Sequence, residues 1–174
     1  VSARVYERYE QKLKASNACD FGDLILKTVF LFDREPQTLE AWQDRFRYIL
    51  IDEYQDTNHA QYRLVRHLAD RRKTIAVVGD PDQSIYAWRG ADIQNILNFE
   101  RDYPDCEVVK LEQNYRSTAN ILNSANSVIQ RNLSRKPKRL WTQKGAGEKI
   151  GIFEAESEKE EADFLAREAL RARR

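Results

Sequence analysis

The sequence is poor in the residues that build metal centres and disulfides. It contains no methionine, two cysteines and two histidines among 174 residues. Cys19 and Cys106 show neither CxxC nor Cys/His spacing, which argues against a zinc site or a disulfide framework and favours a reducing cytoplasm. No apolar run approaches the roughly 20 residues of a membrane helix, so we expect a soluble protein without a membrane partner.

A large charge of one sign is also absent. Lys and Arg number 29 and Asp and Glu 28, so the net charge neither supports nor excludes a nucleic-acid partner. The six glycines are scattered singly, and the phosphate-binding loop GxxxxGK[ST] does not occur. Position 1 is not methionine and the first residues have the pattern of a helix interior, so we expect a piece of a longer protein.

What is present suits one folded domain, or one domain and part of another. Short apolar runs predict strands over residues 48–51, 74–78 and 108–111, and their lack of polar alternation predicts burial on both faces. Helical periodicity over residues 59–69 and 91–103 separates these runs. Strand and helix therefore alternate, which predicts an α/β fold with a parallel sheet.

Further elements are predicted on both sides of this region. They are helices over residues 1–14, 23–32 and 39–46, a helix capped by Ser117, a strand over residues 150–153, and a final helix whose capping box pairs Ser157 with Glu160.

The first predicted strand ends in two adjacent carboxylates, Asp52 and Glu53. Ligands of parallel α/β sheets collect at the carboxyl ends of strands. There Asp52 is suited to hold Mg²⁺ and Glu53 to orient or deprotonate a water molecule. A lone acid pair after a strand also serves as a plain helix cap, and this alternative stays open.

The second strand ends in a turn that carries polar and aromatic residues. Gln83 offers an uncharged amide that can report on a phosphate or a bound water. Tyr86, Trp88 and Arg89 form a candidate stacking platform for unpaired bases. The alternative is that the aromatic residues are core anchors and Arg89 a surface residue.

The third strand is followed by Tyr115 and Arg116, just before the predicted cap Ser117. An arginine in this position can reach a γ-phosphate and stabilise the charge that develops during phosphoryl transfer. Most arginines near helix starts have no such role, so the motif is weak when taken singly.

Four motifs in this order, CDFGDLI, ILIDEYQDTN, VVGDPDQSIYAWRGAD and LEQNYRS, resemble superfamily 1 DNA helicases of the UvrD/PcrA/Rep type. The resemblance covers nearly the whole chain. It implies an ATP- and Mg²⁺-dependent motor that moves 3′ to 5′ on single-stranded DNA and unwinds duplex DNA. It also implies two RecA-like domains of the P-loop NTPase fold, with ATP bound between them.

The resemblance assigns a role to each candidate residue. Asp52 is expected to hold Mg²⁺, Glu53 to act as the base, Gln83 to sense the γ-phosphate, Arg116 to be the arginine finger, and Tyr115 to stack on adenine; the expected DNA contacts are Phe21, Tyr86, Trp88 and Arg89.

The resemblance also divides the chain. Residues 1–15 resemble the end of an inserted helical subdomain, residues 16–112 the later part of the first motor domain, and residues 113–174 the start of the second. Since the phosphate loop is missing, we expect an incomplete, internal segment that is inactive alone and has the remaining segments of the same helicase as partners.

Three other interpretations of the sequence stay open. The helicase part of a recombination nuclease of the RecB or AddA kind shares these motifs. A non-catalytic nucleic-acid-binding module would keep the fold without the phosphate loop. A structural α/β domain would use its polar strand ends only as caps.

Overall fold

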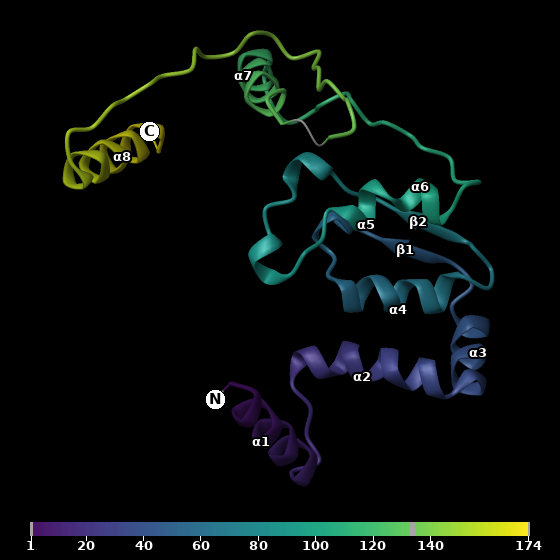
Figure 1. The fold of residues 1–174 in the computed structure, drawn as a ribbon. Helices are drawn as coiled ribbons and strands as arrows, with labels where there is room; N and C mark the ends of the chain where they lie inside the picture. Colours follow the sequence, from purple (N-terminus) through teal and green to yellow (C-terminus); the bar gives the residue numbers. More distant parts are fainter. Residues whose placement is uncertain (1, 133–134, 174) are drawn as a thin grey trace. The chain divides into compact units, whose positions relative to one another are not determined.

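The computed structural model describes residues 2–132 and 135–173. The chain divides into two compact units (Figure 1). Unit 1 comprises residues 1–109 and 134–136, and unit 2 comprises residues 110–133 and 137–174. The main division lies between residues 109 and 110, close to the boundary expected near residue 112. The assignment of these segments to named motor domains stays a prediction.

Three helices open unit 1, where the sequence pattern predicts them. They are α1 (Ser2–Ala15), α2 (Phe21–Arg34) and α3 (Pro36–Arg45). Asp20 caps α2 because its Oδ1 accepts a hydrogen bond from the Asp23 backbone N at 2.8 Å. Pro36 begins α3, where a missing N–H leaves no hydrogen bond unmade.

The sheet of unit 1 consists of β1 (Ile49–Ile51) and β2 (Ile75–Val77). The two strands are parallel, as predicted, with Ile49 opposite Ile75 and Ile51 opposite Val77. Helix α4 (His59–Ala69) crosses from one to the other and begins at a capping box of Asn58 and Gln61. This βαβ unit brings the carboxyl ends of both strands to one edge of the sheet.

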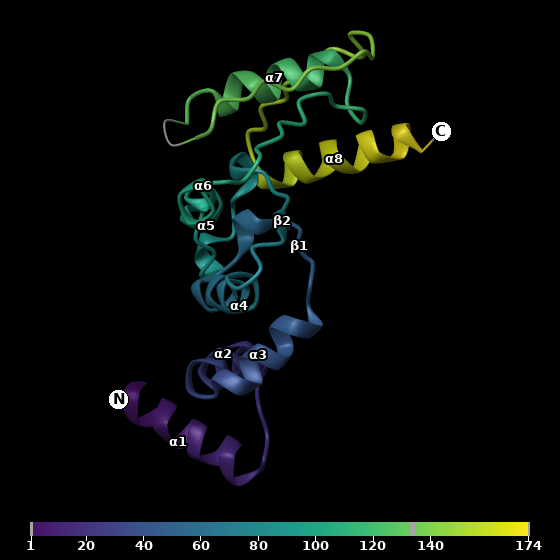
Figure 2. The ribbon, with the colours of Figure 1, turned by 90° about the vertical axis from the view of Figure 1, so that its right-hand side faces the viewer.

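Only one face of this sheet is covered, so the prediction of strands buried on both faces is wrong. In Figure 2, helices α4, α5 (Gln94–Leu97) and α6 (Phe99–Asp102) lie to the left of both strands. Ile49 and Ile51 are half-buried, whereas Leu50, whose side chain alternates to the other face, is 74 % exposed. Ala76, which is paired with Leu50 in the register, is exposed as well.

The helix predicted over residues 91–103 is divided in two. Asn98 ends α5 and precedes α6, and its backbone angles (φ −92°, ψ 3°) leave the helical range. The strands predicted over residues 108–111 and 150–153 are not formed. A strand needs a neighbour for its backbone hydrogen bonds, and the described part of the chain pairs no strand with either segment.

An aromatic cluster forms the core beneath the sheet edge. Tyr54 is 1 % exposed and meets Phe99 edge-on at a centroid distance of 5.8 Å. Phe99 in turn packs on Tyr103 at 4.8 Å. The hydroxyl of Tyr103 donates to Asp70 Oδ1 at 3.2 Å, which satisfies the polar end of the buried ring.

Burial raises the pKa of Tyr54 from 10.0 to about 12. Above pH 10 the unfolded chain would release this proton before the folded chain does, so the folded state is progressively destabilised. We expect the free energy of unfolding to fall by up to about 2–3 kcal/mol between pH 10 and 12. Denaturant unfolding of wild type and Tyr54→Phe over this pH range measures how much of the decrease in the free energy of unfolding comes from Tyr54.

The exposed Tyr48 provides a matched control, because Tyr48→Phe removes a phenol that the fold does not bury. Burial also raises the pKa of Tyr103, so some pH dependence should persist in Tyr54→Phe. An identical loss of stability in wild type and Tyr54→Phe would contradict the assignment.

Unit 2 contains two helices, α7 (Ala119–Ile129) and α8 (Glu158–Ala172). The N-cap of α7 is Thr118, so the prediction of a Ser117 cap is wrong; the Ser117 backbone N instead donates to Asn114 Oδ1 at 2.7 Å. Ser157 caps α8 as predicted. The Glu160 carboxylate accepts from the Glu156 N at 2.9 Å, one residue before the expected partner.

Segments distant in sequence meet beside α7. Gln113 and Trp141 form an isolated parallel bridge, in which the Asn114 N donates to the Trp141 O at 2.7 Å. Asn126 of α7 donates from Nδ2 to the Leu140 O at 2.9 Å. No helix within residues 2–132 or 135–173 has the length and apolar character needed to cross a bilayer.

Candidate functional site

The carboxyl end of β1 carries the acid pair. Asp52 and Glu53 are both exposed, and Asp52 Oδ1 accepts a hydrogen bond from the Glu53 backbone N at 2.9 Å. Glu53 has left-handed backbone angles (φ 50°, ψ 43°), which cost a side-chain-bearing residue roughly 1–2 kcal/mol. This turn leads from the strand into the short 3₁₀ helix η1 (Tyr54–Asp56) and leaves both carboxylates at the sheet edge.

A buried glutamine, which the sequence interpretation missed, lies directly behind the acid pair. Gln55 Nε2 donates to Glu53 Oε2 at 2.8 Å, and Gln55 Oε1 accepts from the Asp80 backbone N at 3.0 Å. One side chain thus joins the ends of both strands. A signal was present: an uncharged amide stands inside the acidic run DEYQD, where it has carboxylates to bind.

Gln83 lies at the end of the second strand, in the 3₁₀ helix η2 (Pro81–Gln83), and is exposed. Its Nε2 donates to Asp80 Oδ2 at 2.8 Å, while Asp80 Oδ1 accepts from the Asp82 N at 2.9 Å and caps η2. Arg135, which belongs to the same unit, makes a bidentate contact with Asp82 at 3.0 and 2.7 Å. The loop that carries Gln83 is therefore held from two sides.

The predicted stacking residues form an exposed cluster in unit 1. Trp88 is 73 % exposed, and its ring lies 6.3 Å from that of Tyr86. The guanidinium carbon of Arg89 lies over both rings, 4.6 Å from the Trp88 centroid and 5.5 Å from that of Tyr86. In the structure, therefore, Tyr86 and Trp88 are not buried core anchors.

The loop bearing this cluster is anchored to the first strand end. Its 3₁₀ helix η3 (Ala87–Arg89) closes at Gly90, whose φ of 85° favours glycine. The Asp92 N then donates to the Thr57 O at 3.0 Å, and buried Asn95 donates to the same oxygen at 3.0 Å. Both strand ends and the aromatic loop consequently form one hydrogen-bonded assembly.

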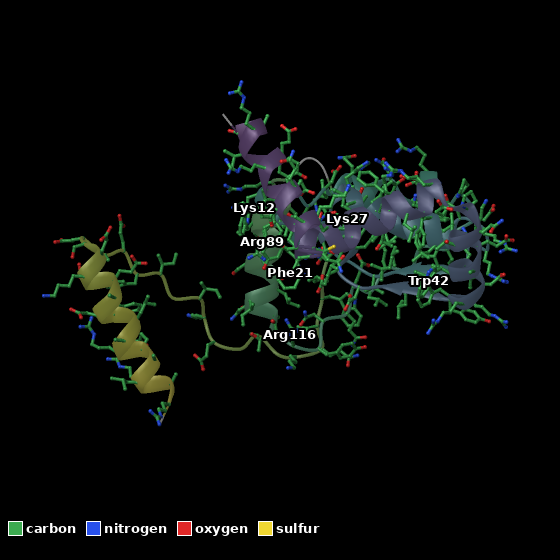
Figure 3. The ribbon with its side chains drawn as sticks, turned by 90° about the horizontal axis from the view of Figure 1, so that it is seen from below. Lys12, Phe21, Lys27, Trp42, Arg89 and Arg116 are labelled. Atoms are coloured by element: carbon green, nitrogen blue, oxygen red, sulfur yellow. The ribbon has the colours of Figure 1, made fainter. Side chains whose placement is uncertain are left out.

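Phe21 is the first residue of α2 and is 91 % exposed. The capping box of Asp20 fixes the backbone at this point, so the ring projects from a rigid helix start. Figure 3 labels Phe21 and Arg89, which come from α2 and the aromatic loop of the same unit.

Tyr115 and Arg116 belong to unit 2 and are both exposed. The Tyr115 hydroxyl donates to Gln113 Oε1 at 2.9 Å, and the Arg116 N donates to Asn114 Oδ1 at 2.9 Å. The Arg116 carbonyl accepts from Lys144 Nζ at 2.9 Å, which leaves the guanidinium group to extend from a fixed turn.

The acid pair fits a magnesium–phosphate complex better than a metal bound by protein alone. No cluster of three or more His, Cys, Asp or Glu ligands occurs in the described part of the chain. Mg²⁺ in phosphoryl-transfer sites usually takes one or two carboxylates and fills its other positions with water and phosphate oxygens. Exposed Asp52 meets that requirement.

Two models of known protein families match this chain. A family model described as the UvrD/REP helicase N-terminal domain matches residues 1–104. The chain belongs to the UvrD/REP helicase family. A second model, described as the UvrD-like helicase C-terminal domain, matches residues 109–173 of this UvrD/REP family chain.

Individual relatives are also similar over nearly the whole UvrD/REP family chain. Proteins named ATP-dependent DNA helicase PcrA, from Staphylococcus epidermidis and Staphylococcus aureus, are each 56 % identical to it over 172 residues. The matches cover 99 % of this chain and 24 % of each relative. The chain therefore spans about a quarter of the length of the curated relatives it matches.

Proposed function

We propose that this chain is a segment of an ATP-dependent DNA helicase that moves 3′ to 5′ along single-stranded DNA. The observation that carries the proposal is the hydrogen-bonded edge of the sheet, where the acid pair, Gln83 and the aromatic loop are joined. We assign unit 1 to a RecA-like domain of the P-loop NTPase fold, because its parallel βαβ arrangement places polar residues at the strand ends. The proposed location of the protein is the cytoplasm.

In this proposal each residue of the acid pair has its own task. Asp52 would hold Mg²⁺, and Glu53 would accept the proton of the attacking water. Bound Mg²⁺–ATP supplies the transferable phosphoryl group and neutralises charge on its oxygens. Gln83 would contact the γ-phosphate through its side-chain amide, whose orientation is set by the hydrogen bond to Asp80. In unit 2, Tyr115 would stack on adenine and Arg116 would stabilise charge on the transferring group.

The aromatic cluster would bind the single strand. Every base has a stacking face, so Trp88 and Tyr86 would hold successive bases without reading their sequence, and Phe21 would add a further contact. Arg89, held over both rings, would add a positive charge beside the strand backbone. Duplex DNA ahead of the strand would be the substrate for unwinding.

Direction of movement tests the proposal in the full-length protein that contains this segment. We expect ATP hydrolysis that depends on Mg²⁺ and rises with single-stranded DNA. A duplex with a 3′ single-stranded tail should be unwound, and the same duplex with a 5′ tail should not. Absence of ATP hydrolysis, or unwinding from the 5′ tail alone, would overturn the proposal.

The isolated 174-residue chain should not hydrolyse ATP above the buffer background. Its sequence lacks the phosphate loop, and removing such a clamp takes away most of the electrostatic stabilisation of phosphoryl transfer. A phosphate-release assay on the purified chain, with intact-mass analysis to exclude companion polypeptides, measures this. Sustained turnover by the chain alone would contradict the expectation.

A further inference from the structure

Gln55 is the only side chain in the described residues that binds the ends of both strands through its own amide atoms. It is 1 % exposed and lies in η1, directly after the acid pair. Its Nε2 donates to Glu53 Oε2 at 2.8 Å and makes a longer contact of 3.4 Å with Asp56 Oδ2. Its Oε1 accepts from the Asp80 backbone N at 3.0 Å.

The connection continues beyond Asp80. The Asp80 carboxylate accepts from Gln83 Nε2 at 2.8 Å, so Glu53, Gln55, Asp80 and Gln83 form one unbroken hydrogen-bonded series. Its first and last members are the two side chains that the proposed function places at the reacting phosphate. Three hydrogen bonds, together with the covalent bonds of Asp80 between its N and its carboxylate, therefore connect the two ends.

The chemistry of this position requires a glutamine. The side chain must donate to a carboxylate on one side and accept from a backbone N–H on the other, and an amide does both. An ionised glutamate cannot donate and would place a second negative charge against Glu53. An apolar residue of the same size would fill the space and leave the partly buried Asp80 N–H without this partner.

The surrounding backbone holds the amide in place. A Cβ added to Gly79 would lie 2.5 Å from Gln55 Oε1 and 3.1 Å from the Tyr54 N, so the chain passes against the amide without a side chain between them. Glu53 itself is held in left-handed backbone angles, a conformation that needs support from its neighbours. The bond from Gln55 supplies that support at the carboxylate.

We propose that Gln55 is a positioning residue, which orients the Glu53 carboxylate and couples it to Gln83. The inference rests on the proposed function, since it assigns Glu53 to the attacking water. Without Gln55, the base would lose its fixed orientation, and movement of the Gln83 loop would no longer reach it. Turnover should then fall while binding of nucleotide and DNA is retained.

The test uses Gln55→Met and Gln55→Glu in the full-length protein. We expect kcat for DNA-stimulated ATP hydrolysis to fall by about tenfold or more, as for other losses of fixed orientation. KM for ATP and the affinity for single-stranded DNA should stay within about twofold. Gln43→Glu is the matched control, because Gln43 is also partly buried and donates through Nε2, to the His67 O at 2.6 Å, without touching the acid pair.

A double-mutant cycle separates coupling from general damage. If the hydrogen-bonded series couples Glu53 to Gln83 through Gln55, Gln55→Met combined with Gln83→Ala should lower kcat no more than the worse single variant does. The pair Gln43→Glu and Gln83→Ala should instead multiply their separate effects. Multiplying losses in the Gln55 pair, or a kcat within about twofold of wild type for folded Gln55→Met, would overturn the inference.

Folding is monitored by the thermal unfolding midpoint and by DNA affinity. If Gln55→Glu unfolds because of its buried charge, the uncharged Gln55→Met decides the matter. Unfolding of both variants would also overturn the inference, because it would make Gln55 a residue of stability alone. A wild-type protein without ATP hydrolysis would instead reject the proposed function itself.

Discussion

Replacing Glu53 with glutamine in the full-length protein should lower ATP turnover by about 10²- to 10⁴-fold while nucleotide binding stays within about twofold. The substitution keeps the size of the side chain and an oxygen that can accept the hydrogen bond from Gln55. It removes the negative charge that would take the proton of the attacking water. Steady-state hydrolysis and binding of a fluorescent nucleotide analogue give the two quantities.

Glu40→Gln is the control for this substitution, because Glu40 is an exposed glutamate of α3 whose carboxylate lies 3.4 Å from Arg71. We expect its turnover to match wild type. Equal losses of binding and turnover in Glu53→Gln would show that this carboxylate holds the nucleotide complex, and would remove the assignment of Glu53 as the base.

Truncating Trp88 to alanine should weaken binding of single-stranded DNA by about 5- to 150-fold, since one stacked base contributes about 1–3 kcal/mol. ATP hydrolysis without DNA should change by less than about twofold. The structure places this ring outside the core, where its loss leaves no cavity. Fluorescence anisotropy with a labelled oligonucleotide, at a fixed salt concentration, measures the affinity.

Trp42→Ala provides the matched tryptophan control. Trp42 lies on α3, stacks on Phe46 at a centroid distance of 5.4 Å, and is labelled well away from Arg89 in Figure 3. Its truncation should lower stability without the selective loss of DNA affinity. A Trp88→Ala protein that binds DNA normally but unfolds more easily would place Trp88 in a structural role.

Helices α1 to α4 of unit 1 could be predicted because each carries its own local information. The apolar periodicity of residues 59–69 predicts α4 at its observed bounds, whereas the helix predicted over residues 39–46 begins three residues earlier, at Pro36. The parallel pairing of β1 and β2 followed from the helix between them, since a crossover of that kind joins parallel strands. These features depend on residues close together in the chain.

The residues of a segment alone could not show whether it forms a strand, because a strand also needs a partner. Residues 108–111 and 150–153 have a strand-like composition, but the described chain pairs neither segment with a strand. Composition reports preference, whereas a strand exists only when another segment accepts its hydrogen bonds. The prediction of Ser117 as the cap of α7 was also wrong: the Ser117 N–H donates to Asn114, a residue before the helix, and Thr118 is the N-cap.

The sequence by itself determined the order of the motifs, the family resemblance and the positions of the acid pair, Gln83 and the aromatic residues. Only the tertiary structure decided how these residues are connected. Gln55 is one of several glutamines in the sequence, and its importance lies in burial between two strand ends that are about 25 residues apart. The run DEYQD indicates an amide beside carboxylates, but the contact with Asp80 depends on the crossing of α4, which brings distant backbone together.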